Sequence, residues 1–291
     1  MKPAPFSYHS PKTVQETVSM LAEFQDQGRV LAGGQSLIPL MNFRLAQPAH
    51  LIDVNPVSEL DFIRREDGWL AVGACCRQAA AEASKEVAER APLLLEALKL
   101  VGHPPIRHRG TVGGSLAHAD PAAELPAVAL AMDADVVVAS TRGTRTVPAA
   151  EFFQGPFTTA LRPDELLTEC RFQTWPSAGT GWAFLEFSRT HGNFAVVGAA
   201  TLVHLDGERV DRAAIALCGV DGKPIRARRA EQRLVGDAPT AESVAAAAEE
   251  AVTGLEPASD VHGSADYRRK LARVYVRRAL ELAIARAKGG R

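Results

Sequence analysis

The sequence is poor in cysteine and aromatic residues, and it has almost no net charge. Its four cysteines among 291 residues include only one close pair, Cys75 and Cys76, and no C-x-x-C spacing. This pattern argues against a disulfide scaffold, a zinc ribbon or a cysteine-ligated iron–sulfur cluster within the chain. With 33 basic and 34 acidic residues the formal charge is −1, so no overall field would gather nucleic acid or an acidic membrane.

Long hydrophobic runs are also missing. Charges interrupt every Ala/Leu-rich segment before it reaches the roughly 18–20 apolar residues of a membrane span. The first residues, Met1–Phe6, lack the apolar run of a secretory signal. The remaining composition, 46% hydrophobic and 23% charged, is that of a globular protein. Together with cysteines that read as reduced thiols, these features predict a cytoplasmic protein.

The spacing of apolar residues predicts helices and strands in close alternation. Helices are predicted at residues 12–25, 78–101 with a break at Pro92, 240–253 and 264–288. Strands are predicted at residues 29–32, 50–54, 62–63, 69–72, 135–139, 194–204 and 212–218. Residues 102–126 are rich in Gly and Pro and predict irregular structure, and residues 174–181 are the best candidate linker.

A diglycine loop follows the first predicted strand. It reads Ala32-Gly33-Gly34-Gln35-Ser36 and continues into Leu37. Two glycines allow positive φ and close approach to a ligand, and consecutive backbone N–H groups can surround an anion. The alternative is a tight strand-to-helix turn that binds nothing.

A second diglycine loop lies in the Gly- and Pro-rich region, in the stretch Gly110–Pro121. It repeats small residues, a hydroxyl and then a carboxylate, Asp120, which the following proline holds extended. Such a carboxylate could accept hydrogen bonds from sugar hydroxyls, and the alternative is an Asx turn. Neither loop matches G-x-G-x-x-G or G-x-x-x-x-G-K-[ST], so the chain has neither the Rossmann fingerprint nor a P-loop.

Four separated motifs, in order, resemble those of the FAD-carrying medium subunit of molybdenum hydroxylases, the group that includes xanthine dehydrogenase and carbon monoxide dehydrogenase. The motifs cover nearly the whole chain. They are the two diglycine loops, the second approached through Ile106–Gly110, the segment Phe184–Ala195, and the closing segment Ala265–Leu271. The chain departs from the family pattern in three respects: Asn193 stands for the usual Asp, Leu185 and Glu186 stand where some members use Lys, and His108 stands for Asn.

The resemblance implies a mixed α/β and α+β fold in three parts. Residues 1–56 would form a small α/β FAD-binding lobe, residues 57–175 a larger mixed FAD-binding lobe, and residues 176–291 a C-terminal domain of a sheet plus helices. It also implies a set of FAD-binding residues: Ala32, Gly33, Gly34, Gln35, Ser36 and Leu37 at the pyrophosphate, Thr111, Gly114, Ser115 and Ala117 along the cofactor, Asp120 at the sugar chain, and Leu166, Leu167 and Phe194 near the isoalloxazine.

The function implied is electron transfer, without a catalytic side chain or a metal in this chain. The [2Fe-2S] clusters and the molybdopterin would belong to a small iron–sulfur subunit and a large molybdopterin subunit, arranged as a dimer of heterotrimers. Electrons would pass from the clusters through FAD to an external acceptor. The sequence names neither the substrate of the complex nor that acceptor.

Two alternatives to this function stay open: a stand-alone FAD-dependent reductase or oxidase, and a non-enzymatic nucleotide-binding assembly module. Two further features have plainer interpretations. His103, His108, His118 and Asp120 lack the regular spacing of a metal site. Arg269, Arg273 and Arg277 form a basic stripe on the last predicted helix that reads as a solvated face better than as a docking surface.

Overall fold

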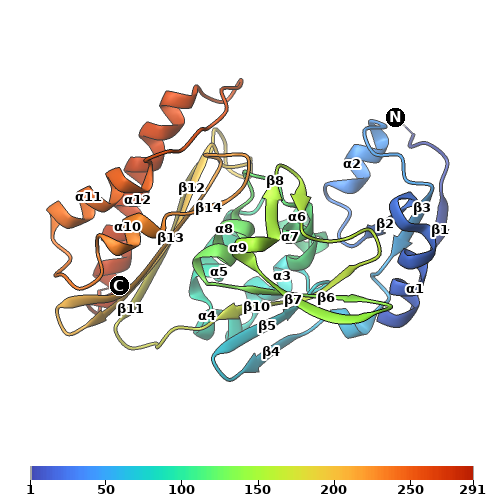
Figure 1. The fold of residues 1–291 in the computed structure, drawn as a ribbon, viewed down its shortest axis with the longest axis horizontal. Helices are drawn as coiled ribbons and strands as arrows, with labels where there is room; N and C mark the ends of the chain where they lie inside the picture. Colours follow the sequence, from blue (N-terminus) through green and yellow to red (C-terminus); the bar gives the residue numbers. More distant parts are fainter. Residues whose placement is uncertain (1, 291) are drawn as a thin grey trace.

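The structure, a computed structural model, describes residues 2–290, so the first residue of the range 1–56 and the last of 176–291 lie outside it. It is an elongated molecule in which the three larger sheets, with their helices, lie side by side (Figure 1). The predicted mixture of α/β and α+β structure is confirmed: the three-stranded sheet is parallel, and the five-, four- and two-stranded sheets are antiparallel. We keep the division at residues 56 and 175 as a proposal. In the described part of the chain no helix is both long and apolar enough to cross a membrane.

The first lobe is a three-stranded parallel sheet with one helix against it. Its strands lie in the order β1 (Ser7–His9), β3 (His50–Asp53) and β2 (Gly28–Leu31), and the helix is α1 (Val14–Phe24). Because parallel strands end at the same edge, the loop after β2 and the turn after β3 emerge side by side. The first diglycine loop runs from β2 into a short helix, α2 (Leu37–Asn42).

The middle of the molecule is a five-stranded antiparallel sheet. Its strands lie in the order β4 (Ile63–Glu66), β5 (Trp69–Gly73), β10 (Leu166–Gln173), β6 (Asp135–Ser140) and β7 (Gly143–Pro148). A small hairpin, β8 (Phe153–Gly155) and β9 (Thr158–Thr159), and a short helix, α9 (Ala149–Phe152), follow β7. Strand β10 was not predicted, although it is the central strand.

The helix predicted at 78–101 is three helices. They are α3 (Gln78–Ala83), α4 (Lys85–Arg90) and α5 (Pro92–Leu100). The break at Pro92 is confirmed, because proline begins α5 at a position where its missing N–H costs nothing. The extra break comes from Ser84, which ends α3 and caps α4 by accepting a hydrogen bond from the Val87 N–H.

The expectation of irregular structure at 102–126 is wrong. This region forms α6 (Pro104–Arg109), α7 (Val112–His118) and the start of α8 (Glu124–Ala131). Prolines begin α6, and Thr111 caps α7 with its side chain. Local capping and packing therefore outweigh the low helix propensity of the two glycines in the first turn of α7.

The last part is a four-stranded antiparallel sheet covered on both faces. Its strands lie in the order β11 (Thr180–Phe187), β12 (Val197–Asp206), β13 (Arg209–Cys218) and β14 (Ile225–Arg226). Helices α10 (Arg228–Gln232), α11 (Ala241–Ala251) and α12 (Ala265–Ala287) lie on the outer side, and α5 and α8 contact the inner side (Figure 1). Apolar residues alternate between the two faces, as a doubly covered sheet requires.

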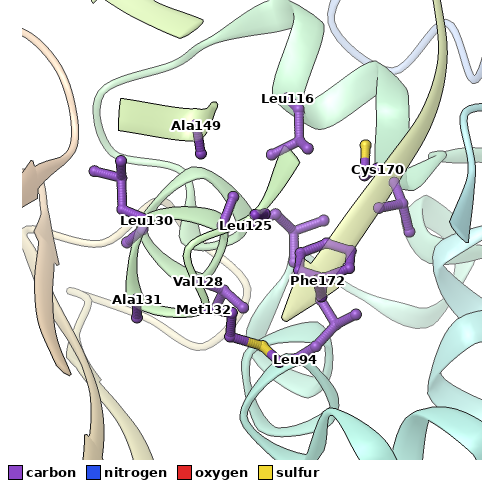
Figure 2. Packing of buried hydrophobic residues seen from close by; sticks show 14 of the residues in the cluster. Leu94, Leu116, Leu125, Val128, Leu130, Ala131, Met132, Ala149, Cys170 and Phe172 are labelled. Atoms are coloured by element: carbon purple, nitrogen blue, oxygen red, sulfur yellow. The ribbon is translucent and has the colours of Figure 1, made fainter. Parts of the chain in front are cut away.

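The largest core cluster joins the middle sheet to the last one. Figure 2 shows Phe172 of β10 facing Leu94, Leu125 and Met132, which come from α5, α8 and the turn after α8. Every residue of α8 is buried. This helix is therefore enclosed between the antiparallel sheets and their helices, and it anchors the last sheet to the rest of the molecule.

Candidate functional site

The loop at residues 32–36 presents a row of free backbone donors. Within residues 2–290 no group accepts a hydrogen bond from the backbone N–H of Gly33, Gly34, Gln35 or Ser36. Gly34 has φ of +74°, so the loop curls as consecutive N–H groups must in order to surround an anion. The Gln35 side chain stabilises the curl by donating to the Gly33 carbonyl at 3.1 Å. In the described part of the chain the loop is thus a nest of four N–H donors without partners, a geometry that suits an anion.

The second diglycine stretch is the capped first turn of α7. The Thr111 hydroxyl accepts the Gly114 N–H at 2.9 Å, and the Thr111 carbonyl accepts the Ser115 N–H at 3.2 Å. These donors are satisfied within the chain. Contrary to the expectation that it repeats the chemistry of the first loop, this stretch is therefore not a second nest.

The other two N–H groups of this turn bond to the segment after β5. Val112 donates to Cys76 at 3.0 Å and Gly113 to Ala74 at 3.1 Å. A Cβ on Gly113 would lie only 2.6 Å from the Ala74 Cα, so glycine is needed here for close packing. This glycine therefore lets α7 pack closely against the segment after β5.

The two glycine-containing segments meet, although nearly 80 residues separate them in the sequence. A Cβ on Gly33 would lie 2.5 Å from the Arg109 carbonyl oxygen and 2.7 Å from the Gly110 Cα. On the other side, a Cβ on Gly114 would lie 3.7 Å from the Ala32 Cβ. The nest therefore borders the first turn of α7, and the two segments line one site.

The half-exposed side of α7 carries three of the residues predicted to lie along a cofactor, whereas the fourth, Thr111, is buried at the start of the helix. Gly114, Ser115 and Ala117 are partly exposed, whereas Leu116 faces the core. Asp120 is also partly exposed, and its Oδ1 accepts the Ala122 N–H at 2.9 Å, which is the Asx turn of the alternative interpretation. No group in the described chain bonds to Asp120 Oδ2, which leaves that oxygen as an acceptor.

The three residues predicted near an isoalloxazine differ in accessibility. Leu166 and Leu167 of β10 are 3% and 5% exposed, because their side chains belong to core clusters. Phe194 is 63% exposed, in the segment between β11 and β12. That segment lies beside the residue that precedes α6, since a Cβ on Gly192 would lie 2.5 Å from the His103 ring. Of the three, only Phe194 offers an open side chain.

Two glutamates near the site, one buried and one partly buried, were not predicted as functional. Glu124, at the start of α8, is 4% exposed; burial raises its pKa to about 7, and the nearby Asp120 charge adds to the effect. Burial raises the pKa of Glu186 in β11 to about 8, with Glu124 contributing. Glu186 Oε2 is buried without a hydrogen-bond partner in the described chain. Near pH 7 the Glu186 carboxyl therefore favours its protonated form, and the Glu124 carboxyl, with a pKa of about 7, is close to its titration midpoint.

A buried arginine on α12 secures the segments around these glutamates. Arg268 donates to the Val196 carbonyl at 2.6 Å and to the Gly219 carbonyl at 3.0 Å, and it pairs with both oxygens of Asp260 at 2.7 and 2.8 Å. Gly219 in turn donates to the Pro121 carbonyl at 2.8 Å. Arg268 therefore holds the segment after β11 and, through Gly219, the turn before α8.

Sequence reasoning missed the polar groups beneath the nest. Asn55 donates from Nδ2 to the Ala32 carbonyl at 2.9 Å and accepts at Oδ1 from Arg77 Nη2 at 2.5 Å. Arg77 Nη1 donates to the Arg109 carbonyl. Asn55 could have been suspected, because it follows a strand parallel to the one that carries the nest; nothing in the sequence marks Arg77.

The remaining sequence candidates do not form a site. Within residues 2–290 no three His, Cys, Asp or Glu side chains gather to hold a metal ion. Each arginine of the basic stripe pairs with an acidic residue: Arg269 with Asp266, Arg273 with Glu249, and Arg277 with Glu281. The stripe is therefore a surface of paired charges, as the plainer interpretation expected.

Comparisons with known proteins agree along the whole length. Residues 4–175 match the family model described as the FAD binding domain in molybdopterin dehydrogenase, and residues 182–283 match the CO dehydrogenase flavoprotein C-terminal domain. The chain is 44% identical to the 6-hydroxypseudooxynicotine dehydrogenase complex subunit alpha of Paenarthrobacter nicotinovorans, over 99% of this chain and 97% of the relative. It is 41% identical to the carbon monoxide dehydrogenase medium chain of Hydrogenophaga pseudoflava, over 98% and 99%.

A solved structure carries the same fold. The chain superposes on carbon monoxide dehydrogenase from Hydrogenophaga pseudoflava, in a form lacking the Mo-pyranopterin moiety of its cofactor, with a TM-score of 0.96. The identity is 43%, and the match covers 98% of this chain and 99% of the other.

Proposed function

The chain belongs to the family of FAD-carrying subunits of molybdenum hydroxylases, and from this we propose that it binds one FAD and passes electrons from iron–sulfur clusters to an external acceptor. The observation that carries the proposal is the nest at residues 33–36, which borders α7 and whose four N–H donors have no partner within residues 2–290. Such a nest suits the pyrophosphate of a dinucleotide.

The residues present fit this cofactor. Ala32 to Leu37 would hold the pyrophosphate, since the backbone donors of residues 33–36 have no partner in the described chain. Thr111, Gly114, Ser115 and Ala117 would lie along the cofactor, and the free Oδ2 of Asp120 would accept from sugar hydroxyls. Phe194 offers an exposed ring for the isoalloxazine, and Leu166 and Leu167 would support it from the core.

The flavin supplies the redox chemistry when bound, and the protein supplies binding, orientation and the electrostatic environment. No side chain of this chain has to act as an acid, a base or a nucleophile. The nest N–H groups would hold negative charge, and the raised pKa values of Glu124 and Glu186 reduce the negative charge that these two carboxyls carry near the site. A bound flavin without a catalytic side chain favours electron transfer between redox partners over a complete enzymatic reaction within this chain.

The other redox centres would come from partner chains. We propose a small iron–sulfur subunit and a large molybdopterin subunit, assembled with this chain as a dimer of heterotrimers. We also propose a cytoplasmic location, which the four free, buried cysteines support. The relatives named above differ in the substrate that their names state, so membership of the family does not fix the substrate, and we propose that the large partner subunit sets it.

The test begins with the visible spectrum of the purified chain and the amount of FAD released on heating. We expect oxidised-flavin absorption and one FAD per chain. In the complex with its partners, anaerobic reduction of the iron–sulfur subunit should bleach this absorption. A chain that is colourless and rejects added FAD, both alone and in the complex, would contradict the proposal.

A further inference from the structure

We propose that Arg77 is a positioning residue that sets the distance between the nest and the first turn of α7, and thereby tunes the site for a diphosphate. This inference deepens the proposed function and rests on it. The observation behind it is a side-chain bridge, Asn55 and Arg77, that reaches the backbone of both segments.

One end of the bridge is fixed to the nest. Asn55 Nδ2 donates to the carbonyl of Ala32, the residue directly before the free N–H groups. The amide cannot turn over, because Asn55 also donates to Asp53 Oδ1 from Nδ2 at 2.5 Å and from its backbone N–H at 2.9 Å. Tyr8 completes this end by donating to Asp53 Oδ2 at 2.6 Å.

The carboxylate of Asp53 keeps its charge while it orients the amide. Burial alone would raise its pKa, but hydrogen bonds from Tyr8 and Asn55 and the nearby Arg109 charge hold the pKa of Asp53 below its usual range. An ionised carboxylate only accepts hydrogen bonds, so the amide NH2 faces Asp53 and Ala32 and the amide oxygen faces Arg77.

The other end of the bridge is fixed to the approach to α7. The two terminal nitrogens of Arg77 are shared between Asn55 Oδ1 and the Arg109 carbonyl. That same carbonyl oxygen is the atom that a Cβ on Gly33 would approach to 2.5 Å. Arg77 therefore bonds at the point where the two segments are closest, and a planar guanidinium fixes both partners at once.

The charge of Arg77 also suits the ligand. In the described chain no carboxylate forms a salt bridge with it, whereas most other buried or half-buried arginines pair with acids. An uncompensated cation beneath four free N–H groups favours a doubly charged diphosphate over a less charged group. The Asn55–Arg77 bridge thus fixes the distance between the nest and the segment before α7, and it also places a positive charge beneath the nest.

The test compares ligand affinities of the FAD-free full chain. Arg77→Met should weaken binding of FAD and of ADP about 10- to 150-fold, the effect of one lost charge-assisted hydrogen bond, and leave AMP binding within about threefold. Arg64→Met is the matched control, because Arg64 also contacts two partners, Glu66 and Glu169, on a strand remote from the nest. It should leave all three affinities unchanged.

A second variant tests the bridge as a unit. Asn55→Ala should also weaken FAD binding, and the double variant should be no more than about threefold weaker than Arg77→Met alone, since both residues act through one path. If the losses of FAD affinity in the two single variants add in the double variant, the proposal that Asn55 and Arg77 act as one bridge is overturned. Equal loss of FAD, ADP and AMP binding, or unchanged FAD binding in Arg77→Met, would also overturn it. A wild-type chain that binds no FAD would instead refute the proposed function.

Discussion

Gly33 lies so close to the segment that leads into α7 that the single methyl group of a Gly33→Ala substitution tests whether this contact matters for the site. Alanine at this position would place its Cβ 2.5 Å from the Arg109 carbonyl oxygen and 2.7 Å from the Gly110 Cα. Gly33 does not have a positive φ, unlike Gly34, so the substitution brings no backbone strain. Its whole effect is to push two backbone segments apart.

The size of the effect follows from that geometry. An ordinary carbon-to-oxygen contact is about 3.3–3.6 Å, so the segments must separate by about 1 Å. Overpacking of this kind costs about 1–3 kcal/mol. This free-energy cost destabilises the arrangement in which both segments contact the ligand. At 1.4 kcal/mol for each tenfold, FAD affinity should therefore fall by about 5- to 140-fold.

The assay is a titration of the FAD-free chain with FAD, alongside thermal unfolding. Gly155→Ala is the matched control, because a Cβ there has nothing within 4 Å. We expect wild-type affinity in the control and weak binding in Gly33→Ala. A folded Gly33→Ala chain that binds FAD within twofold of wild type would refute the idea that both segments hold the cofactor.

Three further predictions concern stability. Burial raises the pKa of Glu124 to about 7 and that of Glu186 to about 8, so the stability that these protonated carboxyls give the folded state is complete below the unfolded pKa near 4.5 and is lost as the pH rises to 8. Glu124→Gln should therefore reduce the fall in melting temperature between pH 4.5 and 8.5, and an unchanged fall would contradict this prediction. Phe172→Ala should cost about 3–5 kcal/mol in denaturant unfolding, because the ring is fully buried; a loss below about 1 kcal/mol would mean that the cavity collapses. Arg268→Met should cost about 1–3 kcal/mol by leaving two carbonyls unpaired, and a stability equal to wild type would show that water replaces the guanidinium.

Much of this fold could be predicted from local pattern. The strand at 50–54 and the helix at 264–288 carry the apolar periodicity of their elements, and both are confirmed within a residue or two. The glycines of the first diglycine loop also predicted its curl, because Gly34 has a positive φ; that the loop binds an anion stays a prediction. These features depend on neighbours in the sequence, which is where sequence reasoning is strong.

The rest depends on contacts between distant segments. The turn that contains Gly114 was expected to resemble the first loop, yet its donors are used by the Thr111 cap and by the segment after β5. Arg77 becomes important only because folding places it between Asn55 and the carbonyl of Arg109. Glu124 looks like an ordinary first-turn acid until the last sheet covers it.

The enclosure of α8 has a consequence for how this protein can be divided. The helix sits in the first of the two family-defined regions, but part of its surface is covered by strands of the second. A chain truncated near residue 175 would expose that apolar surface to solvent, and an exposed apolar helix face promotes self-association. The FAD-binding region is therefore not an independent unit: a fusion protein that contains it without the last sheet must include another element that buries the exposed face of α8.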